Sequence, residues 1–298
     1  MIIARKEHPL KTYIDLHIHS TASDGTFSPT EIVNNAVKIA GKGNPIVIAL
    51  TDHDTTSGIE EFQTAALAHQ PQLTAISGIE ISTNYHGIEI HILGYNIDSR
   101  NKTLIDKLTI YRKSRDGRNE KIIKKLNEHG FKISAEELKP EKSGESIGRP
   151  HIARLLMKKN YVTSVQEAFD KYLAEGKCCY VERIMPTPQE AIDLIQDSGG
   201  LPVLAHIMLY KKLDAAHKEK LVYELKEAGL FGIEAYYNTY TPAEQEYVIS
   251  LAKQWGLSLT GGTDFHGQNK PHISLFKGQG NMEIPENILK NLNTNLLG

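Results

Sequence analysis

Short apolar strands alternate with helices in both outer parts of this chain. Strand patterns cover 13–19, 46–51, 73–82 and 88–94, and they return at 201–206, 231–237 and 257–263. Helical patterns separate most of these strands, and the first begins at Ser28, an N-cap followed by Pro29. Because strands that alternate with helices form mostly parallel sheets, this order predicts an α/β fold with a mostly parallel sheet, open or closed.

The alternation is interrupted between residues 101 and 182. Long helical stretches replace it there, at 104–129, 152–159 and 165–175. Residues 101–160 hold 16 Lys and Arg but 8 Asp and Glu, a net charge of +8, so the remaining residues carry −10 of the total of −2. Such a helical surface either is merely solvated or attracts phosphate groups, and both interpretations stay open. The length of 298 residues accommodates one barrel, 1–100 and 183–298, with an inserted helical domain, 101–182.

Composition excludes several classes of protein. The first seven residues lack the apolar run of a secretory signal, and no later stretch is apolar for long enough to span a bilayer, so we expect a cytoplasmic protein without a membrane partner. A net charge of −2 argues against a protein that coats nucleic acid. Cys178 and Cys179 supply neither a disulfide framework nor a four-cysteine zinc site, and we expect both to be small buried side chains.

Histidines and carboxylates stand at the ends of the predicted strands. His17 and His19 are two residues apart on the first strand and therefore project from the same face, where they can grip one cation. Asp52, His53 and Asp54 directly follow the second strand. Consecutive polar side chains are costly to bury without partners, and a loop at the carboxyl end of a strand avoids that cost. Taken alone, this second motif also fits a turn or a helix cap.

Further candidate ligands occur at the other strands. Asp264 and His266 follow the last strand with the same spacing, after Gly261 and Gly262, which permit close backbone approach. The remaining candidates, on strands or in the loop after the first strand, are Glu80, His91, His206 and Asp24. A parallel barrel places the carboxyl ends of its strands on one rim, so one metal cluster on that rim explains all of these positions together.

These motifs resemble the conserved blocks of the polymerase and histidinol phosphatase (PHP) family. The resemblance rests, in order, on His17-x-His19 and on the segments 51–54, 78–80, 205–206 and 263–266, and it covers about residues 12–97 and 186–267. It implies a distorted (β/α)7 barrel of the PHP type with a trinuclear metal centre. The helical domain would be inserted into this barrel.

The resemblance also implies how the ligands divide among the metals, with Glu80 as a bridge between the first and the second. The three expected sets are His17, His19, Glu80 and Asp264; Glu80, His91 and His206; and Asp24, His53 and His266. Mixed imidazole and carboxylate ligands suit manganese, zinc and iron alike, so the expected cofactors are two or three divalent ions of these elements.

The inserted domain carries a second resemblance. Residues 148–154 are similar to the insert of the PHP subgroup that dephosphorylates nucleotide bisphosphates and trims RNA from its 5′ end. Arg149 is suited to clamp a phosphate, and His151 to donate a proton to a leaving oxygen. In the alternative interpretation, Arg149 pairs with a neighbouring acid and His151 begins a helix. Asp52 is a second candidate for proton transfer, and the sequence does not decide between it and His151.

The sequence therefore predicts a metal-dependent phosphoesterase. Clustered cations lower the pKa of bound water to about 7, so that hydroxide can attack phosphorus at neutral pH. The expected substrates are phosphate monoesters of nucleotides, in particular 3′,5′-bisphosphates, or the 5′ ends of short oligoribonucleotides, and no protein partner is required. The alternatives that stay open are a histidinol-phosphate phosphatase, an amidohydrolase-type barrel hydrolase, and a non-enzymatic module that binds metal or nucleotide.

Overall fold

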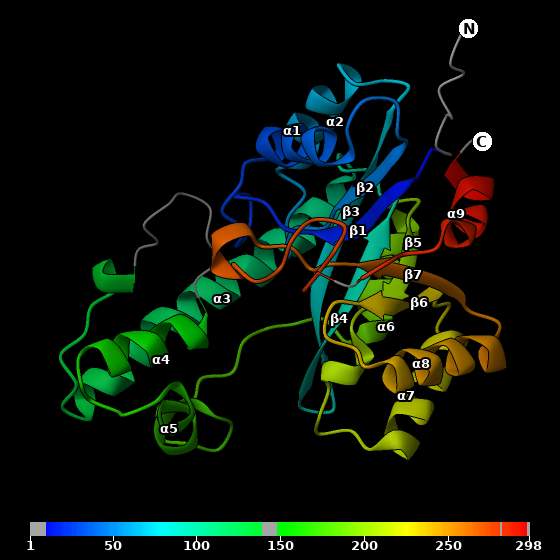
Figure 1. Cartoon of the computed structure of the whole chain (residues 1–298). Helices are drawn as coiled ribbons and strands as arrows, with labels where there is room; N and C mark the ends of the chain where they lie inside the picture. Colours follow the sequence, from blue (N-terminus) through cyan, green and yellow to red (C-terminus); the bar gives the residue numbers. More distant parts are fainter. Residues whose placement is uncertain (1–9, 139–147, 281, 297–298) are drawn as a thin grey trace, which may run out of the picture.

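The strands and helices follow the order expected from the sequence (Figure 1). The computed structural model describes residues 10–138, 148–280 and 282–296. The strands are β1 (Tyr13–Ile18), β2 (Ile46–Leu50), β3 (Leu73–Tyr85), β4 (Ile88–Tyr95), β5 (Leu201–Leu204), β6 (Gly232–Tyr237) and β7 (Ser258–Gly262). The helices are α1 (Pro29–Ala40), α2 (Ile59–Leu67), α3 (Lys102–Glu128), α4 (Arg149–Lys158), α5 (Val165–Ala168), α6 (Pro188–Asp197), α7 (Ala215–Glu227), α8 (Pro242–Trp255) and α9 (Leu289–Leu296). Four short 3₁₀ helices are described: η1 (Glu136–Leu138), η3 (Ile207–Leu209), η4 (Gly267–Asn269) and η5 (Glu286–Ile288). The segment η2 (Phe169–Leu173) is a short π-helix.

Three helices of the barrel begin with the same capping sequence. Ser28, Thr187 and Thr241 are the N-cap residues of α1, α6 and α8, and each is followed by proline. Each hydroxyl accepts a hydrogen bond from the backbone N–H of a glutamate three residues later, and that glutamate in turn accepts from the N-cap backbone. Since this box satisfies two backbone donors and proline presets the first φ, local sequence is enough to set where these helices begin.

The seven strands form one sheet in sequence order, and most neighbours are parallel. The exception is β4, which runs antiparallel to both β3 and β5. The sheet is therefore mixed. The reversal follows from the turn between β3 and β4, where His86 and Gly87 have φ of +49° and +84°, the positive φ pair typical of a two-residue hairpin turn.

The two outer strands approach each other and nearly close the sheet into a barrel. Ile18 pairs with Phe265 just beyond β7, and the N–H of His19 donates to the Phe265 carbonyl at 2.9 Å. A side chain at Gly262 would place its Cβ 2.3 Å from the backbone nitrogen of His17. The last strand can therefore pass the first only because glycine stands there, in agreement with the expectation from the sequence.

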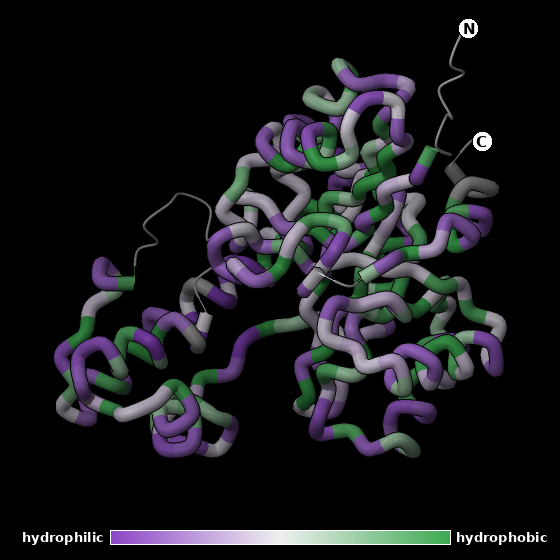
Figure 2. Tube along the Cα trace, in the orientation of Figure 1, coloured by the Kyte–Doolittle hydropathy of each residue, from purple (hydrophilic) through white to green (hydrophobic). Residues whose placement is uncertain are grey.

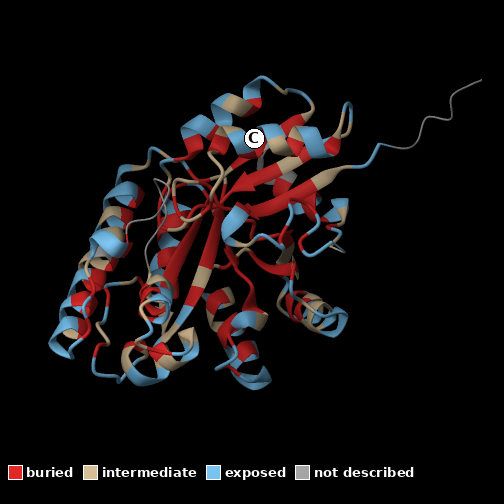
Figure 3. Ribbon diagram, turned by 60° about the vertical axis from the view of Figure 1, so that its left-hand side comes forward, coloured by how far each residue is buried: buried red, intermediate tan, exposed pale blue. Residues whose placement is uncertain are grey.

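Helices cover the outside of this barrel. Ile32 of α1 and Phe62 of α2 pack with the residues of β1 and β2, while α6, α7 and α8 pack over β3 to β6. Figure 2 shows the apolar residues concentrated along the strands, and Figure 3 shows these strands buried at the centre with the outer helix faces exposed. Among the described residues, no helix combines the length and the apolar character needed to cross a bilayer.

The insert has an apolar cluster of its own, and α3 connects it to the barrel. Leu104 and Leu108, near the start of α3, belong to the barrel core, whereas Ile122 and Leu126 pack against α4 and α5 in a cluster drawn from residues 122–181. In Figure 1, α4 and α5 lie beside the far end of α3, away from the sheet. Cys179 is buried in this cluster as expected, but Cys178 is exposed, because its position at the turn after η2 faces solvent.

Candidate metal centre

Residues from the first and last strands meet at one end of the barrel. The Nε2 atoms of His17 and His19 lie 3.1 Å apart, as expected for residues on one face of a strand. Asp264 Oδ1 lies 3.6 Å from His17 Nε2 and 3.3 Å from His19 Nε2. Glu80 Oε2 lies 3.3 Å and 3.2 Å from the same two nitrogens. The structure therefore brings the four residues of the first expected set together.

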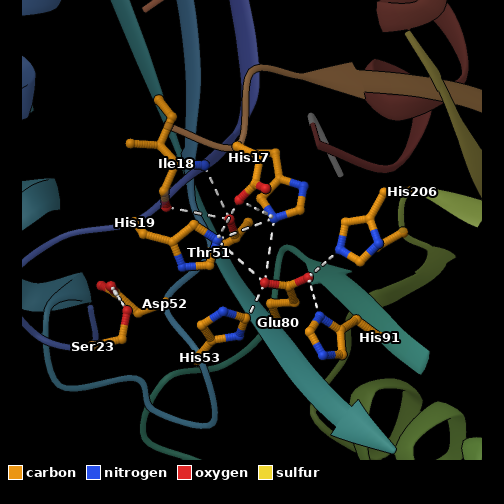
Figure 4. A network of polar contacts seen from close by, with 12 residues as sticks. His17, Ile18, His19, Ser23, Thr51, Asp52, His53, Glu80, His91 and His206 are labelled. Carbon is orange, nitrogen blue, oxygen red and sulfur yellow. Dashed lines mark hydrogen bonds and ion pairs between the residues drawn. The ribbon is translucent and has the colours of Figure 1, made fainter. Parts of the chain in front are cut away.

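Glu80 lies at the centre of the cluster (Figure 4). Its Oε1 is 2.8 Å from His91 Nδ1 and 2.9 Å from His206 Nε2, and its Oε2 is 3.0 Å from His53 Nδ1. These imidazoles come from β4, from the end of β5 and from the loop after β2. One carboxylate thus faces imidazoles on both sides, which is the arrangement that a bridging ligand requires.

Asp24 belongs to the same cluster although it stands in the loop after β1. Its carboxylate oxygens lie 3.3 Å from His266 Nε2, 3.6 Å from His19 Nδ1 and 3.8 Å from His53 Nε2. All nine candidate ligands therefore lie at one end of the barrel, and none is dispersed to another face.

The buried charges shift one another's protonation. Burial alone would lower the pKa of His19, but its close contacts with the carboxylates of Asp264 and Glu80 outweigh burial and raise that pKa to about 9. The pKa of His91 rises to about 10, because its contact with Glu80 outweighs the effect of burial. Burial would raise the pKa of Glu80, yet the surrounding imidazoles hold it well below its usual range. In the absence of cations, these histidines and carboxylates neutralise one another.

The donor set fits divalent cations. Three buried atoms that face other members of the cluster make no hydrogen bond of acceptable geometry among the described residues, although His53 Nδ1 and Glu80 Oε2 lie 3.0 Å apart: His19 Nδ1, His53 Nδ1 and Glu80 Oε2. Unsatisfied buried polar atoms are costly, and ligation by a cation would satisfy such nitrogens and oxygens. Three overlapping groups have ligand atoms within 4.8 Å of one another: His17, His19 and Glu80; His53, Glu80 and His91; and His19, Asp24, His53 and His266.

The backbone is strained at the same place. Asp54, His206 and Asp264 have φ of +50°, +27° and +53°, values that residues other than glycine rarely adopt. Asp54 accepts a hydrogen bond from the Ser82 N–H at 2.9 Å and pairs with Arg115 of α3. Strain of this kind persists only when the surrounding contacts hold it, and it is frequent at functional sites.

Three residues that the sequence analysis did not single out hold the ligands in place. Glu234 of β6 is fully buried, with Oε1 2.9 Å from His17 Nδ1 and Oε2 accepting from the His206 N–H at 2.8 Å. The Tyr237 hydroxyl and the Lys270 ammonium donate to Asp264 Oδ2 at 2.7 Å and 2.6 Å. A glutamate within the apolar strand pattern 231–237 was the available signal, since a carboxylate is rarely buried without a partner.

Asp52 is buried beside the loop between Ser20 and Asp24. Its carboxylate accepts hydrogen bonds from the Ser20 N–H at 2.7 Å and the Ser20 hydroxyl at 2.6 Å, and also from the Ser23 hydroxyl. Burial raises its pKa above the usual value. These hydrogen bonds tie its oxygens to the loop that carries Asp24.

A cavity of about 290 Å³ joins the cluster to the insert. One side is lined by Asp24, His53 and His91, and the other by Arg115, Arg118, Arg149, His151 and Arg183. A larger groove of about 820 Å³ runs along α2 and β3, but its lining includes no histidine, so size alone does not mark the functional site.

The insert side of this cavity carries four arginines, of which Arg115 pairs with Asp54 and Arg183 pairs with Glu89, which also lines the cavity. Burial, followed by the charges of Arg183 and Arg149, lowers the pKa of Arg118 to about 9. The buried Nε atoms of Arg118 and Arg183 have no hydrogen-bond partner within the described ranges. Like charges that burial forces together are stabilised by an anion, and guanidinium groups match the geometry of phosphate.

Arg149 and His151 begin α4, and both line the cavity. The Arg149 guanidinium lies over the rings of Phe169 and Tyr180, 5.9 Å and 5.6 Å from their centroids, and donates to the Leu173 carbonyl at 3.3 Å. His151 Nδ1 accepts from the Gly148 N–H at 3.1 Å. His151 does start a helix, as the alternative interpretation had it, but it also faces the cavity.

Sequence comparisons identify similar proteins over most of the chain. The PHP domain family matches residues 15–182. The 5′-3′ exoribonuclease Rnm of Escherichia coli (strain K12) is 36% identical over 265 residues, which cover 88% of this chain and 87% of that protein. A 3′,5′-nucleoside bisphosphate phosphatase of Chromobacterium violaceum is 32% identical over 254 residues, 85% of this chain and 87% of that protein.

Two solved structures resemble nearly the whole chain. One is an amidohydrolase from Chromobacterium violaceum with bound sulfate and no metal, with a TM-score of 0.78, 28% identity and coverage of 95% of this chain and 96% of that one. The other, from Bifidobacterium adolescentis, is assigned as a metal-dependent phosphoesterase, with a TM-score of 0.75, 26% identity and coverage of 97% and 98%. The expected α/β barrel is thereby confirmed.

Proposed function

This chain belongs to the PHP domain family, and from that premise we propose that its metal-dependent phosphoesterase activity acts on nucleotides that carry a second phosphate, or on the 5′ ends of short oligoribonucleotides. The similar proteins named above include an exoribonuclease and a nucleoside bisphosphate phosphatase. The observation that carries the proposal is the cavity that joins the ligand cluster to four buried or half-buried arginines. Such a cavity suits a substrate with a negative charge at each end.

The nine ligands would hold two or three divalent cations of manganese, zinc or iron. His17, His19, Glu80 and Asp264 would hold one, and Glu80 would share a second with His91 and His206. Asp24, His53 and His266 would hold the third. When bound, such cations lower the pKa of water and neutralise the charge of phosphoryl oxygens during in-line attack.

The arginines would position the other end of the substrate. The Nε donors of Arg118 and Arg183 have no hydrogen-bond partner among the described residues, although Arg183 also pairs with Glu89, and the Arg149 guanidinium lies over two aromatic rings. A phosphate bound among them fixes the distance between the nucleotide and the ligand cluster, so that binding energy distant from the reacting phosphorus contributes to alignment. This interpretation of Arg149 as a phosphate clamp is preferred to pairing with an acid, because the contacts described for it are aromatic rings and a carbonyl.

His151 is the proposed proton donor to the leaving oxygen. Since its Nδ1 accepts from the Gly148 N–H, the neutral ring carries its proton on Nε2, from which it would donate a hydrogen bond to the leaving oxygen; transfer of a proton would start from the doubly protonated ring, in which Nδ1 no longer accepts from Gly148. Asp52 is assigned to holding the Ser20–Asp24 loop instead.

The test compares substrates that differ in one phosphate. Phosphate release is measured with a 3′,5′-bisphosphorylated nucleotide, a nucleoside 5′-monophosphate and a 5′-phosphorylated oligoribonucleotide, with each metal restored after chelation. We expect Arg118→Met to lower kcat/KM for the bisphosphate by at least about tenfold, while that for the monophosphate changes little. Arg154→Met is the matched control, because Arg154 is an exposed arginine on α4 that does not line the cavity.

Other outcomes identify the alternatives. Equal losses on bisphosphate and monophosphate in Arg118→Met would refute a second-phosphate site. Turnover of histidinol phosphate alone would indicate a histidinol-phosphate phosphatase, and hydrolysis of amides or lactones without phosphate release would indicate an amidohydrolase. Metal-dependent nucleotide binding without turnover would indicate a non-enzymatic module.

A further inference from the structure

A second group of ligand atoms lies outside the metal centre, in the insert. The Sγ atoms of Cys178 and Cys179 are 3.7 Å apart, and Cys179 Sγ is 3.9 Å from His129 Nδ1. Each of the three residues offers one ligand atom within 4.8 Å of the others. Cys179 is fully buried, whereas Cys178 and His129 are exposed. The group is therefore open to solvent on one side and closed on the other.

The spacing of these atoms matches a tetrahedral site. Zinc binds thiolate at about 2.3 Å and imidazole at about 2.0–2.1 Å, so a tetrahedron separates two sulfurs by about 3.8 Å and a sulfur from a nitrogen by about 3.6 Å. The observed separations of 3.7 Å and 3.9 Å differ from these edges by a few tenths of an ångström. Small side-chain rotations would suffice to bind one cation.

We propose that Cys178, Cys179 and His129 form a binding site for a thiophilic divalent cation of the zinc class, with water as the fourth ligand on the exposed side. Two thiolates and one imidazole select soft or borderline cations, whereas the barrel centre offers only nitrogen and oxygen. The proposal is independent of the proposed function, because it concerns different residues and a different ligand chemistry.

Binding requires a definite set of proton movements. Burial, followed by the hydrogen bond with Cys178, raises the pKa of Cys179 to about 12. Since cysteine binds such cations as thiolate, the cation must displace the thiol proton of Cys179 to solvent. His129 Nδ1 also lies 2.8 Å from the Lys125 carbonyl, so the ring that donates there must move its proton from Nδ1 to Nε2 before Nδ1 can bind. Occupancy consequently rises with pH.

The site would join two segments that line the substrate cavity. His129 ends α3, and the cysteines precede the segment that returns to the barrel through Tyr180 and Arg183. Lys125 Nζ donates to the Tyr180 carbonyl at 2.9 Å, and the Tyr180 ring lies under Arg149. A cation here would cross-link the end of α3 to this segment and hold the insert in one arrangement.

Cadmium absorption tests the site without reference to activity. The chain has two cysteines, both in this group, so any ultraviolet sulfur-to-cadmium charge-transfer band must come from it. The reduced full-length protein, with its barrel centre already loaded, is titrated with cadmium. We expect one equivalent to produce a saturable band, and prior loading of the site with zinc to raise the cadmium concentration needed for that band.

Variants distinguish a three-ligand site from simple binding by adjacent thiols. We expect Cys178→Ser to lose the saturable band, and His129→Asn to weaken cadmium binding while a band remains. His272→Asn, which changes an exposed histidine outside the group, should titrate like the unaltered protein. Circular dichroism verifies the fold of each variant. The proposal is overturned if no saturable band forms, if prior loading with zinc leaves the cadmium titration unchanged, or if His129→Asn binds cadmium with undiminished affinity.

Discussion

Glu80 is buried in β3, and its two oxygens lie among the imidazoles of His17, His19, His53, His91 and His206. Glu234 is buried in β6 and contacts His17 and the backbone of His206. A buried carboxylate is stable only when paired, so each fixes the direction of the imidazoles around it. Their roles differ, because Glu80 faces the centre of the cluster and Glu234 contacts the outer nitrogen of His17.

The first prediction concerns Glu234. Glu234→Gln should lower the affinity of the centre for metal by about 10- to 100-fold, since a carboxylate behind a ligating imidazole sets its tautomer and basicity. The measurement is competition with a metal-binding dye, together with kcat at saturating metal.

The matched control is Glu246→Gln, an exposed glutamate on α8. This control substitution should change neither the metal affinity of the centre nor kcat at saturating metal. A Glu234→Gln protein with lower thermal stability but unchanged metal affinity would show that Glu234 is needed only for packing.

The second prediction concerns the pH dependence of metal uptake. In the metal-free protein the pKa values of His19 and His91 are raised to about 9 and 10 from 6.5. The contribution of these charged pairs to the free energy of unfolding is therefore fully present below pH 6.5, and it is lost as the pH rises through 9 to 10. Below pH 9 a cation must displace these protons, so apparent metal affinity should rise by at least about tenfold per pH unit between pH 6 and 8.

Calorimetric titrations in two buffers of different ionisation enthalpy would measure the protons released. Affinity that is constant over this range, with no proton release, would contradict the assigned protonation.

At the scale of elements, the β3–β4 hairpin and α3 complete the site. The hairpin reverses β4, so that Ser82 pairs with His91 and Glu80 with Leu93. Glu80 and His91 thereby reach the same end of the barrel from strands of opposite direction. Helix α3 brings Arg115 and Arg118 from the insert to the other side of the cavity.

The third prediction compares two glycines in these elements. Gly87, in the hairpin turn, has a φ of +84°, and Gly87→Ala should lower the free energy of unfolding by about 1–2 kcal/mol through left-handed strain. Gly117 lies within α3, and a Cβ there meets no atom within 4 Å, so Gly117→Ala should raise it by about 1 kcal/mol.

Chemical denaturation of the two variants and the parent, under one set of conditions, measures this difference. Changes of the same sign in both variants would show that the backbone conformations assigned to these glycines are wrong.

At the scale of the whole molecule, the centre depends on closure of the barrel. Its ligands extend from His17 in β1 to His266 just after β7, and these strands meet only at the seam where Gly262 passes His17. We propose that residues 101–182 form a separately packed unit, supported by their own apolar cluster. The start of α3 packs on the barrel, however, so this helix belongs to both parts.

The fourth prediction is that metal stabilises the closed barrel. A single site saturated at 1,000 times its dissociation constant contributes about 4 kcal/mol to stability, because the unfolded chain does not gather these ligands. Chelation should therefore lower the unfolding temperature of the parent protein, and restoring manganese or zinc should recover it.

Asp264→Asn weakens a ligand, so its unfolding temperature should respond far less to metal. Scanning calorimetry measures the unfolding temperature with and without metal. An equal rise on adding metal in the parent and in Asp264→Asn would exclude Asp264 from the centre.

The sequence by itself determined the local elements and the chemical nature of the ligands. Capping boxes at Ser28, Thr187 and Thr241 and the periodicity of apolar residues are local properties, so they could be read along the chain. The same holds for the histidines and carboxylates placed where strands end. The direction of each strand was not determined in this way, because the apolar pattern of a strand is the same in a parallel and in an antiparallel neighbour. The local signal for the reversal of β4 was the His86-Gly87 turn.

Only the tertiary structure decided which residues act together. The central place of Glu80, the contact of Glu234 with His17 and the arginines that face the ligand cluster all join residues far apart in sequence. Their proximity depends on the register of seven strands and on the seam that closes them, and no short segment encodes it. The exposure of Cys178 beside His129 was decided in the same way, by how the insert folds back on the end of α3.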